Sequence, residues 1–332
     1  MSRVNLAGVR ELLRPPPHRG PLIAAGAVVL GVGIALEELR LSGSLGTGVH
    51  MLILLLPGAL IYWLGAQAPN EEGRPPGYQS VLLVTGLLLL YAGLLTAADV
   101  LGADFGPFPA GALVWTSLLA VGLALWPALE RNSAICLLLA AIFGGIALLS
   151  LWRFVFHASS QTPYRWLLLV LALACVLASL ALREPAPRHA QQLISAAGLA
   201  IAVMGLAGLL ASLVTFLSLG AALPGRLPGF WELVLLAAGF GLIAYGALDR
   251  APGPAYLGVL NTGLFIAAVA AGPQPTLYWW PLTLLAVGVV ALGAGLRPRR
   301  PLPPEPRAYR AGEAPLAARA DGDEIVVRVH EE

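Results

Sequence analysis

The residues of this sequence best suited to bind a ligand are two arginines, two tryptophans and one glutamate. Arg153 and Arg165 lie 12 positions apart, Trp166 follows Arg165 directly, and Trp231 precedes Glu232. Guanidinium groups bind phosphate oxygens through paired hydrogen bonds, and indole rings favour the boundary between polar and apolar surroundings. We therefore predict that Arg153, Arg165, Glu232, Trp166 and Trp231 form a site for a lipid headgroup or another anion.

One amide and two thiols lie inside long apolar stretches. Asn261 is the deepest strongly polar side chain, and the simplest role for it is a hydrogen bond between two helices. Cys136 and Cys175 have neither a CxxC spacing nor a neighbouring histidine, so we predict buried free thiols rather than a disulfide or a zinc site. Hydrolase, metalloprotease and nucleotide-binding motifs are missing, so we predict no enzymatic activity, no cofactor and no metal.

The composition shows which surroundings these residues occupy. Hydrophobic residues make up 58% of the 332 residues and charged residues only 11%, with a mean hydropathy of +0.79. Soluble domains carry roughly 25% charged residues, so this chain cannot cover a water-facing surface. The predicted partners are therefore membrane lipids, and the net charge of +2 gives no general attraction to nucleic acid.

The elements that must position the candidate site are apolar helices. A helix needs about 20 apolar residues to cross the hydrocarbon core of a bilayer. The predicted fold class is an all-α polytopic membrane protein with about ten transmembrane helices, at 21–36, 49–66, 79–98, 110–129, 133–152, 164–182, 192–216, 230–248, 255–272 and 278–296. No ionisable residue falls near the middle of a segment, which argues against a pump with a buried acidic relay.

The arginines predict the orientation. With a cytoplasmic N-terminus, sixteen of the twenty arginines fall on the cytoplasmic side and only Arg40, Arg153, Arg165 and Arg226 fall outside. We predict a protein of the cell inner membrane with both termini in the cytoplasm. The expected domains are a cytoplasmic segment over 1–20, a transmembrane domain over 21–296, and a disordered cytoplasmic tail rich in proline and arginine over 297–332. The segment over 1–20 is either an interfacial helix or a solvated start.

Two long stretches repeat each other and predict an internal duplication. GLALWPALER at 122–131 matches GLIAYGALDR at 241–250, and QTPYRW at 161–166 resembles QPTLYWW at 274–280. We predict two parallel units of four helices, the third to sixth and the seventh to tenth, over approximately 79–183 and 192–297. An extra helix pair precedes them, and the repeat axis runs along the membrane normal.

Two plainer interpretations of the candidate site stay open. Six of the eight tryptophans fall on the predicted outer side, where an aromatic belt at the level of the headgroups would explain them without a ligand. Alternatively, Arg165 and Glu232 form an ion pair that ties the two repeats together.

Two classes of function follow from these observations. The first is transport, or the handling of lipids or small molecules, with an outer-face cavity between the repeats. The alternative is a non-catalytic membrane subunit or scaffold whose cytoplasmic tail binds a protein partner. A polar cavity between the repeats would favour transport, and a solid core would favour the scaffold.

Overall fold

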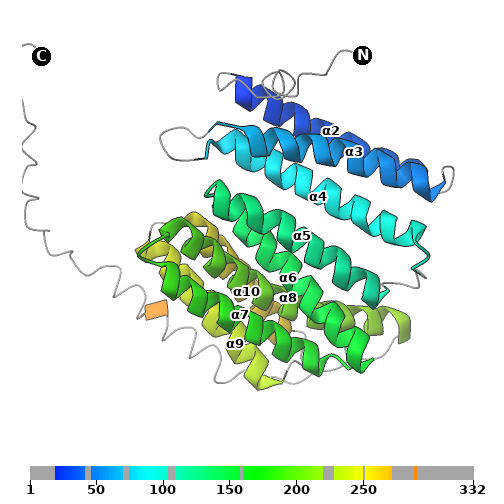
Figure 1. The fold of residues 1–332 in the computed structure, drawn as a ribbon. Helices are drawn as coiled ribbons and strands as arrows, with labels where there is room; N and C mark the ends of the chain where they lie inside the picture. The colour runs from blue at the N-terminus through cyan, green and yellow to red at the C-terminus, as the bar shows by residue number, and fades with distance from the viewer. Residues whose placement is uncertain are drawn as a thin grey trace, which may run out of the picture. The chain divides into compact units, whose positions relative to one another are not determined.

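A computed structural model describes residues 19–41, 46–69, 75–103, 109–157, 160–219, 228–249, 251–270 and 288–289. These residues form long α-helices, with no strand among them, so the predicted all-α class is confirmed. Figure 1 labels the helices, which are α2 (Gly20–Leu41), α3 (Thr47–Gln67), α4 (Gly77–Val100), α5 (Ala110–Glu130), α6 (Ala134–Phe156), α7 (Thr162–Leu182), α8 (Pro187–Leu219), α9 (Gly229–Leu248) and α10 (Pro252–Ala270).

Each of these nine helices of the described part is long and apolar enough to cross a membrane, so the chain is a multi-pass membrane protein. The first nine predicted segments correspond to them one by one. Several helices run further than their segments, most clearly α8, because hydropathy stops at charged residues while backbone hydrogen bonding continues. The predicted tenth segment at 278–296, the helix within 1–20 and the tail at 297–332 lie almost entirely outside the described residues.

The chain divides into two compact units, Met1–Pro273 and Gln274–Glu332, and all nine helices belong to the first. The predicted transmembrane domain over 21–296 runs across this boundary.

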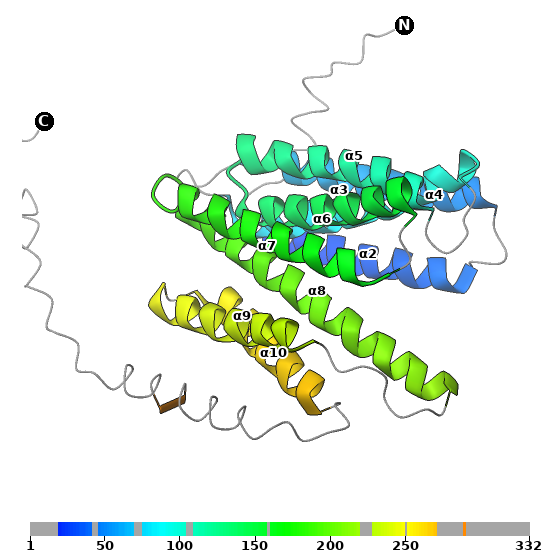
Figure 2. The same ribbon diagram turned by 90° about the horizontal axis from the view of Figure 1, so that it is seen from below.

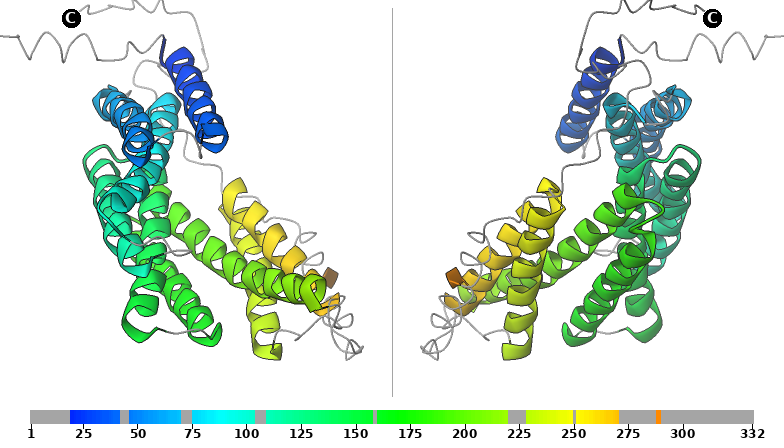
Figure 3. Two further views of the ribbon diagram at one scale, coloured as in Figure 1. Left: turned by 90° about the vertical axis from the view of Figure 1, so that its right-hand side faces the viewer. Right: turned by 90° about the vertical axis from the view of Figure 1, so that its left-hand side faces the viewer.

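Helices that follow each other in the chain pack most closely within the first unit. The most extensive contacts are between α3 and α4, α5 and α6, α9 and α10, and α7 and α8. The long helix α8 also packs on α6 and on α10, while α2 packs mainly on α4. Figures 2 and 3 show the oblique course of α8 past its neighbours and the place of α2 beside α4. The unit is therefore a series of helical hairpins that are joined by the contacts of α4 with α5 and of α8 with α6 and α10.

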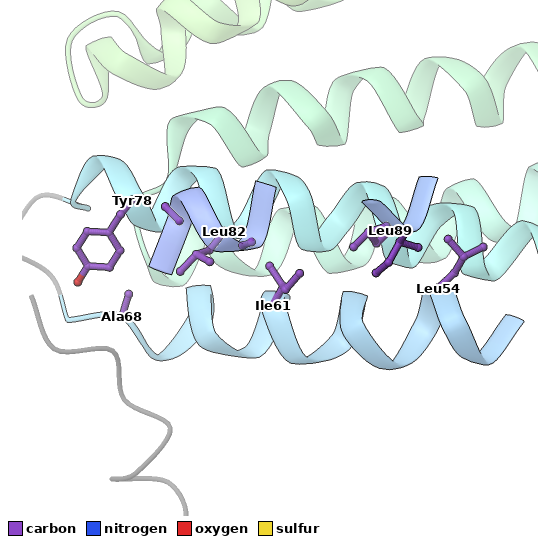
Figure 4. Close-up of a cluster of buried hydrophobic side chains, with 9 residues drawn as sticks. Leu54, Ile61, Ala68, Tyr78, Leu82 and Leu89 are labelled. Atoms are coloured by element: carbon purple, nitrogen blue, oxygen red, sulfur yellow. The ribbon is translucent and has the colours of Figure 1, made fainter. Parts of the chain in front are cut away.

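Small residues allow α3 and α4 to approach each other closely. A Cβ atom on Gly86 would lie 2.6 Å from the backbone nitrogen of Tyr62, and one on Gly58 would lie 2.9 Å from that of Leu90. Close backbone approach at small residues is a main source of helix association in membranes. Figure 4 shows the buried side chains Leu54, Ile61, Leu82 and Leu89 between the two helices.

The packing order supports the predicted duplication without testing it fully. In both α4–α6 and α8–α10, the second and third helices form the closest pair, and the first helix contacts both. The match is not complete, because α10 packs more extensively on α8 than α6 does on α4. The last helix of the second repeat belongs to the segment outside the described residues, so the duplication stays a prediction.

Candidate functional site

A cavity of about 290 Å³ lies between α7, α8 and α9. Its lining is apolar apart from the hydroxyl of one tyrosine, and the lining side chains occupy successive turns of the three helices. In the predicted duplication, α7 ends the first repeat and α8 and α9 begin the second, so this cavity lies between the predicted repeats. Its residues are Leu169, Ala172, Leu173 and Val176 of α7, Ile194, Ala197, Gly198 and Ile201 of α8, and Val234, Ala238, Gly241, Leu242 and Tyr245 of α9.

Three aromatic rings connect α7 and α9 at the N-terminal ends of both helices. Trp166 of α7 stacks on Phe230 at 5.5 Å between ring centroids and meets Trp231 edge-on at 5.0 Å. Phe230 and Trp231 also meet edge-on at 5.0 Å. Trp231 is buried, with only 4% of its surface exposed, whereas Trp166 and Phe230 are about half exposed at 49% and 50%. We call these three residues the aromatic cluster.

A polar contact joins the same two helices at their other ends. Arg183, just after α7, donates to Asp249, just after α9, at 3.5 Å. Tyr245 lies one turn before Asp249 in α9, and its backbone carbonyl accepts the N–H of Asp249. Tyr245 lines the cavity as well. The cavity therefore lies along α7 and α9 between the aromatic cluster and an exposed ion pair.

The predicted site residues are only partly brought together. The structure places Trp166 against Trp231, and Glu232 is fully buried in the first turn of α9, where the helix dipole favours a carboxylate. Arg165 donates a hydrogen bond to Gln161 of its own helix at 3.1 Å. Among the described residues, no ion pair joins Arg165 to Glu232. Arg153 is exposed in the last turn of α6.

Asn261 makes the hydrogen bond between helices that an amide inside an apolar segment predicts. Its side chain is fully buried in α10, and Nδ2 donates to the carbonyl of Gly198 in α8 at 3.0 Å and to that of Leu257 at 2.8 Å. Gly198 also lines the cavity, so this bond holds α10 against α8 directly behind the cavity wall.

No protein-family model, curated protein or solved structure matches this chain. Its chemistry therefore has to be inferred from the residues themselves.

Cysteines and acidic groups of the described part show no metal-binding arrangement. Cys136 and Cys175 are both free and buried, as predicted. No group of three or more His, Cys, Asp and Glu side chains that could hold a metal ion occurs among the described residues.

One buried ionisable pair was not predicted from the sequence. His50 Nδ1 lies 2.6 Å from Glu38 Oε2, and the two side chains are only 10% and 20% exposed. Glu38 falls near the end of α2 and His50 in the first turn of α3, so a short connection brings them together. The sequence did offer a signal for this contact, because an acid and a histidine lie 12 positions apart on either side of a short connection between two predicted helices. Phe230 was also missed, although it directly precedes Trp231.

Proposed function

We propose that this protein binds membrane lipids or similar amphiphiles and handles them within or across the bilayer. The observation that carries the proposal is the apolar cavity between α7, α8 and α9, with two half-exposed aromatic side chains at one end. Aliphatic walls suit an acyl chain, and exposed aromatic rings suit the boundary between chain and headgroup. The cavity is neither the polar one that would favour transport of a solute nor the solid core that would favour a scaffold. Its apolar lining favours a lipid over a hydrophilic substrate.

Arg165 gives the proposed site a preference for an anionic headgroup. It directly precedes Trp166, its side chain is only partly buried, and among the described residues it donates to Gln161. A guanidinium group keeps several donors available after one hydrogen bond and binds phosphate oxygens in pairs. The proposed ligand is thus a phospholipid whose phosphate lies at Arg165 and whose chain enters the cavity.

Replacing Arg165 with alanine should weaken the binding of an anionic phospholipid about tenfold, as expected for the loss of one charge-assisted hydrogen bond. The measurement is native mass spectrometry of phosphatidylglycerol bound to the purified protein. Arg40→Ala is the matched control, because Arg40 is also an exposed arginine at a helix end and is 80% exposed. Equal binding by the two variants would count against the headgroup site.

Thermal stability in detergent tests whether Arg165 and Glu232 tie the repeats together, although no ion pair joins them among the described residues. Without such a tie, the losses of Arg165→Ala and Glu232→Ala should add in the double variant, whereas a loss smaller than the sum would restore it. Additive losses with unchanged lipid binding would reject both interpretations and leave the scaffold class.

The proposal includes an orientation in the cell inner membrane, with both termini in the cytoplasm and the aromatic cluster at the outer face. Reporter fusions after Arg74, Arg131, Arg188 and Arg250 should all report the cytoplasm, because arginine-rich connections remain on that side. A fusion after Ser160, between α6 and α7, should report the opposite side. A periplasmic signal from any two of the first four fusions would contradict this topology.

A further inference from the structure

A second and larger cavity, of about 810 Å³, lies between α2, α3 and α4. Most of its lining is aliphatic, and several of the lining side chains, such as Val32 and Leu88, are about half exposed. The cavity is therefore accessible from outside the bundle as well as from between the helices. Its lining consists of Val28, Gly31, Val32, Ala35 and Glu38 of α2, Leu54 of α3, and Thr85, Leu88, Leu89, Ala92, Leu95 and Thr96 of α4.

Among the described residues of this lining, Glu38 is the one charged side chain. His50 fixes its carboxyl group through the contact of 2.6 Å between His50 Nδ1 and Glu38 Oε2. That contact engages only one carboxylate oxygen. The other, Oε1, is buried, and no hydrogen-bond partner for it occurs among the described residues. His50 Nε2 is likewise buried without such a partner.

A buried acceptor without a partner is costly, and native proteins satisfy nearly all such groups. The hydroxyl group of Thr96 already donates to the carbonyl of Gly93 at 2.9 Å. The neighbouring ion pair between Glu37 and Arg40, at 3.9 Å, is largely exposed and does not belong to the cavity lining. Nothing among the described residues therefore supplies a donor to Glu38 Oε1, and the cavity that Glu38 lines is one place from which a donor can come.

We propose that this cavity binds an amphiphile whose head carries an ammonium or hydroxyl group and whose body is an aliphatic chain. The head donates to Glu38 Oε1, and the chain lies along the aliphatic side chains of α2 and α4. A carboxylate repels phosphate, so this site and the one at Arg165 prefer opposite headgroups. His50 is a positioning residue that holds the carboxylate in place.

The test uses dodecylamine carrying a photoreactive diazirine on its chain, with the full-length protein in lipid nanodiscs. Cross-linked peptides are identified by mass spectrometry. We expect labelling on α2 and α4 that excess dodecylamine suppresses. Suppression by dodecanol as well would assign a hydroxyl head, and suppression by the amine alone would assign an ammonium head. Equal suppression by dodecyl phosphate would overturn the proposal.

Glu38→Gln should lower the amine labelling about tenfold, because a neutral amide forms a weaker hydrogen bond with ammonium than a carboxylate does. Glu37→Gln is the matched control, since it removes the adjacent but exposed carboxylate. Ala35→Phe places a ring in the cavity from an exposed position and should also reduce labelling. Labelling of Glu38→Gln equal to that of Glu37→Gln, or full labelling of Ala35→Phe, would refute the site. This result is independent of phospholipid binding at α7 and α9, so the two proposals can fail separately.

Discussion

Replacing Gly86 with leucine should prevent the protein from accumulating in a folded form. A Cβ atom at this position would lie 2.6 Å from the backbone nitrogen and 2.7 Å from the Cα atom of Tyr62. Backbone atoms cannot rotate aside, so α3 and α4 would have to separate along their most extensive contact. Overpacking usually lowers stability by about 1–3 kcal/mol. A clash with the backbone of a neighbouring helix should lower it by about 3 kcal/mol or more.

Gly122→Leu is the matched control for this variant. Gly122 lies inside α5 with no atom within 4 Å of its hypothetical Cβ, so a side chain there extends into open space. Leucine also favours the helical conformation by roughly 1 kcal/mol over glycine, so this variant should retain wild-type stability. The measurement is the yield of monodisperse protein in detergent and its thermal unfolding. Similar yields and unfolding temperatures for both variants would show that α3 and α4 are not in close contact.

Replacing Trp231 with alanine should destabilise the protein strongly. Its indole is 4% exposed and packs against both other rings of the aromatic cluster. Aromatic-to-alanine changes in soluble cores cost about 3–5 kcal/mol. Lipid tails solvate apolar groups better than water does, which reduces the transfer part of this cost, so we expect a loss of about 2–3 kcal/mol.

Phe230→Ala provides the comparison from the adjacent position. Phe230 also contacts both other rings of the cluster but is half exposed, so its removal leaves no enclosed void. The expected loss is about 1 kcal/mol, the worth of its aromatic contacts. Reversible unfolding in mixed micelles gives both free energies. A loss for Phe230→Ala as large as that for Trp231→Ala would contradict the buried position of the indole.

Hydropathy predicted the helices of this fold because each span has to bury about 20 residues of backbone in lipid. It did not predict which helices meet, because lipid-facing and helix-facing positions are equally apolar. Gly86 and Gly122 illustrate the problem. Both are glycines inside leucine-rich segments of a chain with 38 glycines, yet only Gly86 contacts a neighbouring backbone.

A polar contact was predictable from the sequence only where the type of one side chain determined that a hydrogen bond to another helix had to form. An amide inside an apolar segment needs a hydrogen-bond partner, so Asn261 was expected to bond to another helix, although Gly198 was not identifiable as its acceptor. Arg165 had several possible acceptors, and it bonds to Gln161 one turn away within its own helix. The contact between Glu38 and His50 depends on how α2 and α3 are joined, which residue types alone do not determine.

The preference for consecutive partners has a consequence for biogenesis. Since α3 packs most closely on α4, α5 on α6, α7 on α8 and α9 on α10, each pair can associate soon after its second helix leaves the translocon. Local contacts of this kind form rapidly, because little chain has to be ordered before they are made. The hairpins then have to dock on one another, through the contacts of α4 with α5 and of α8 with α6 and α10. Because α8 takes part in two of these contacts between hairpins, substitutions on that helix should slow maturation most.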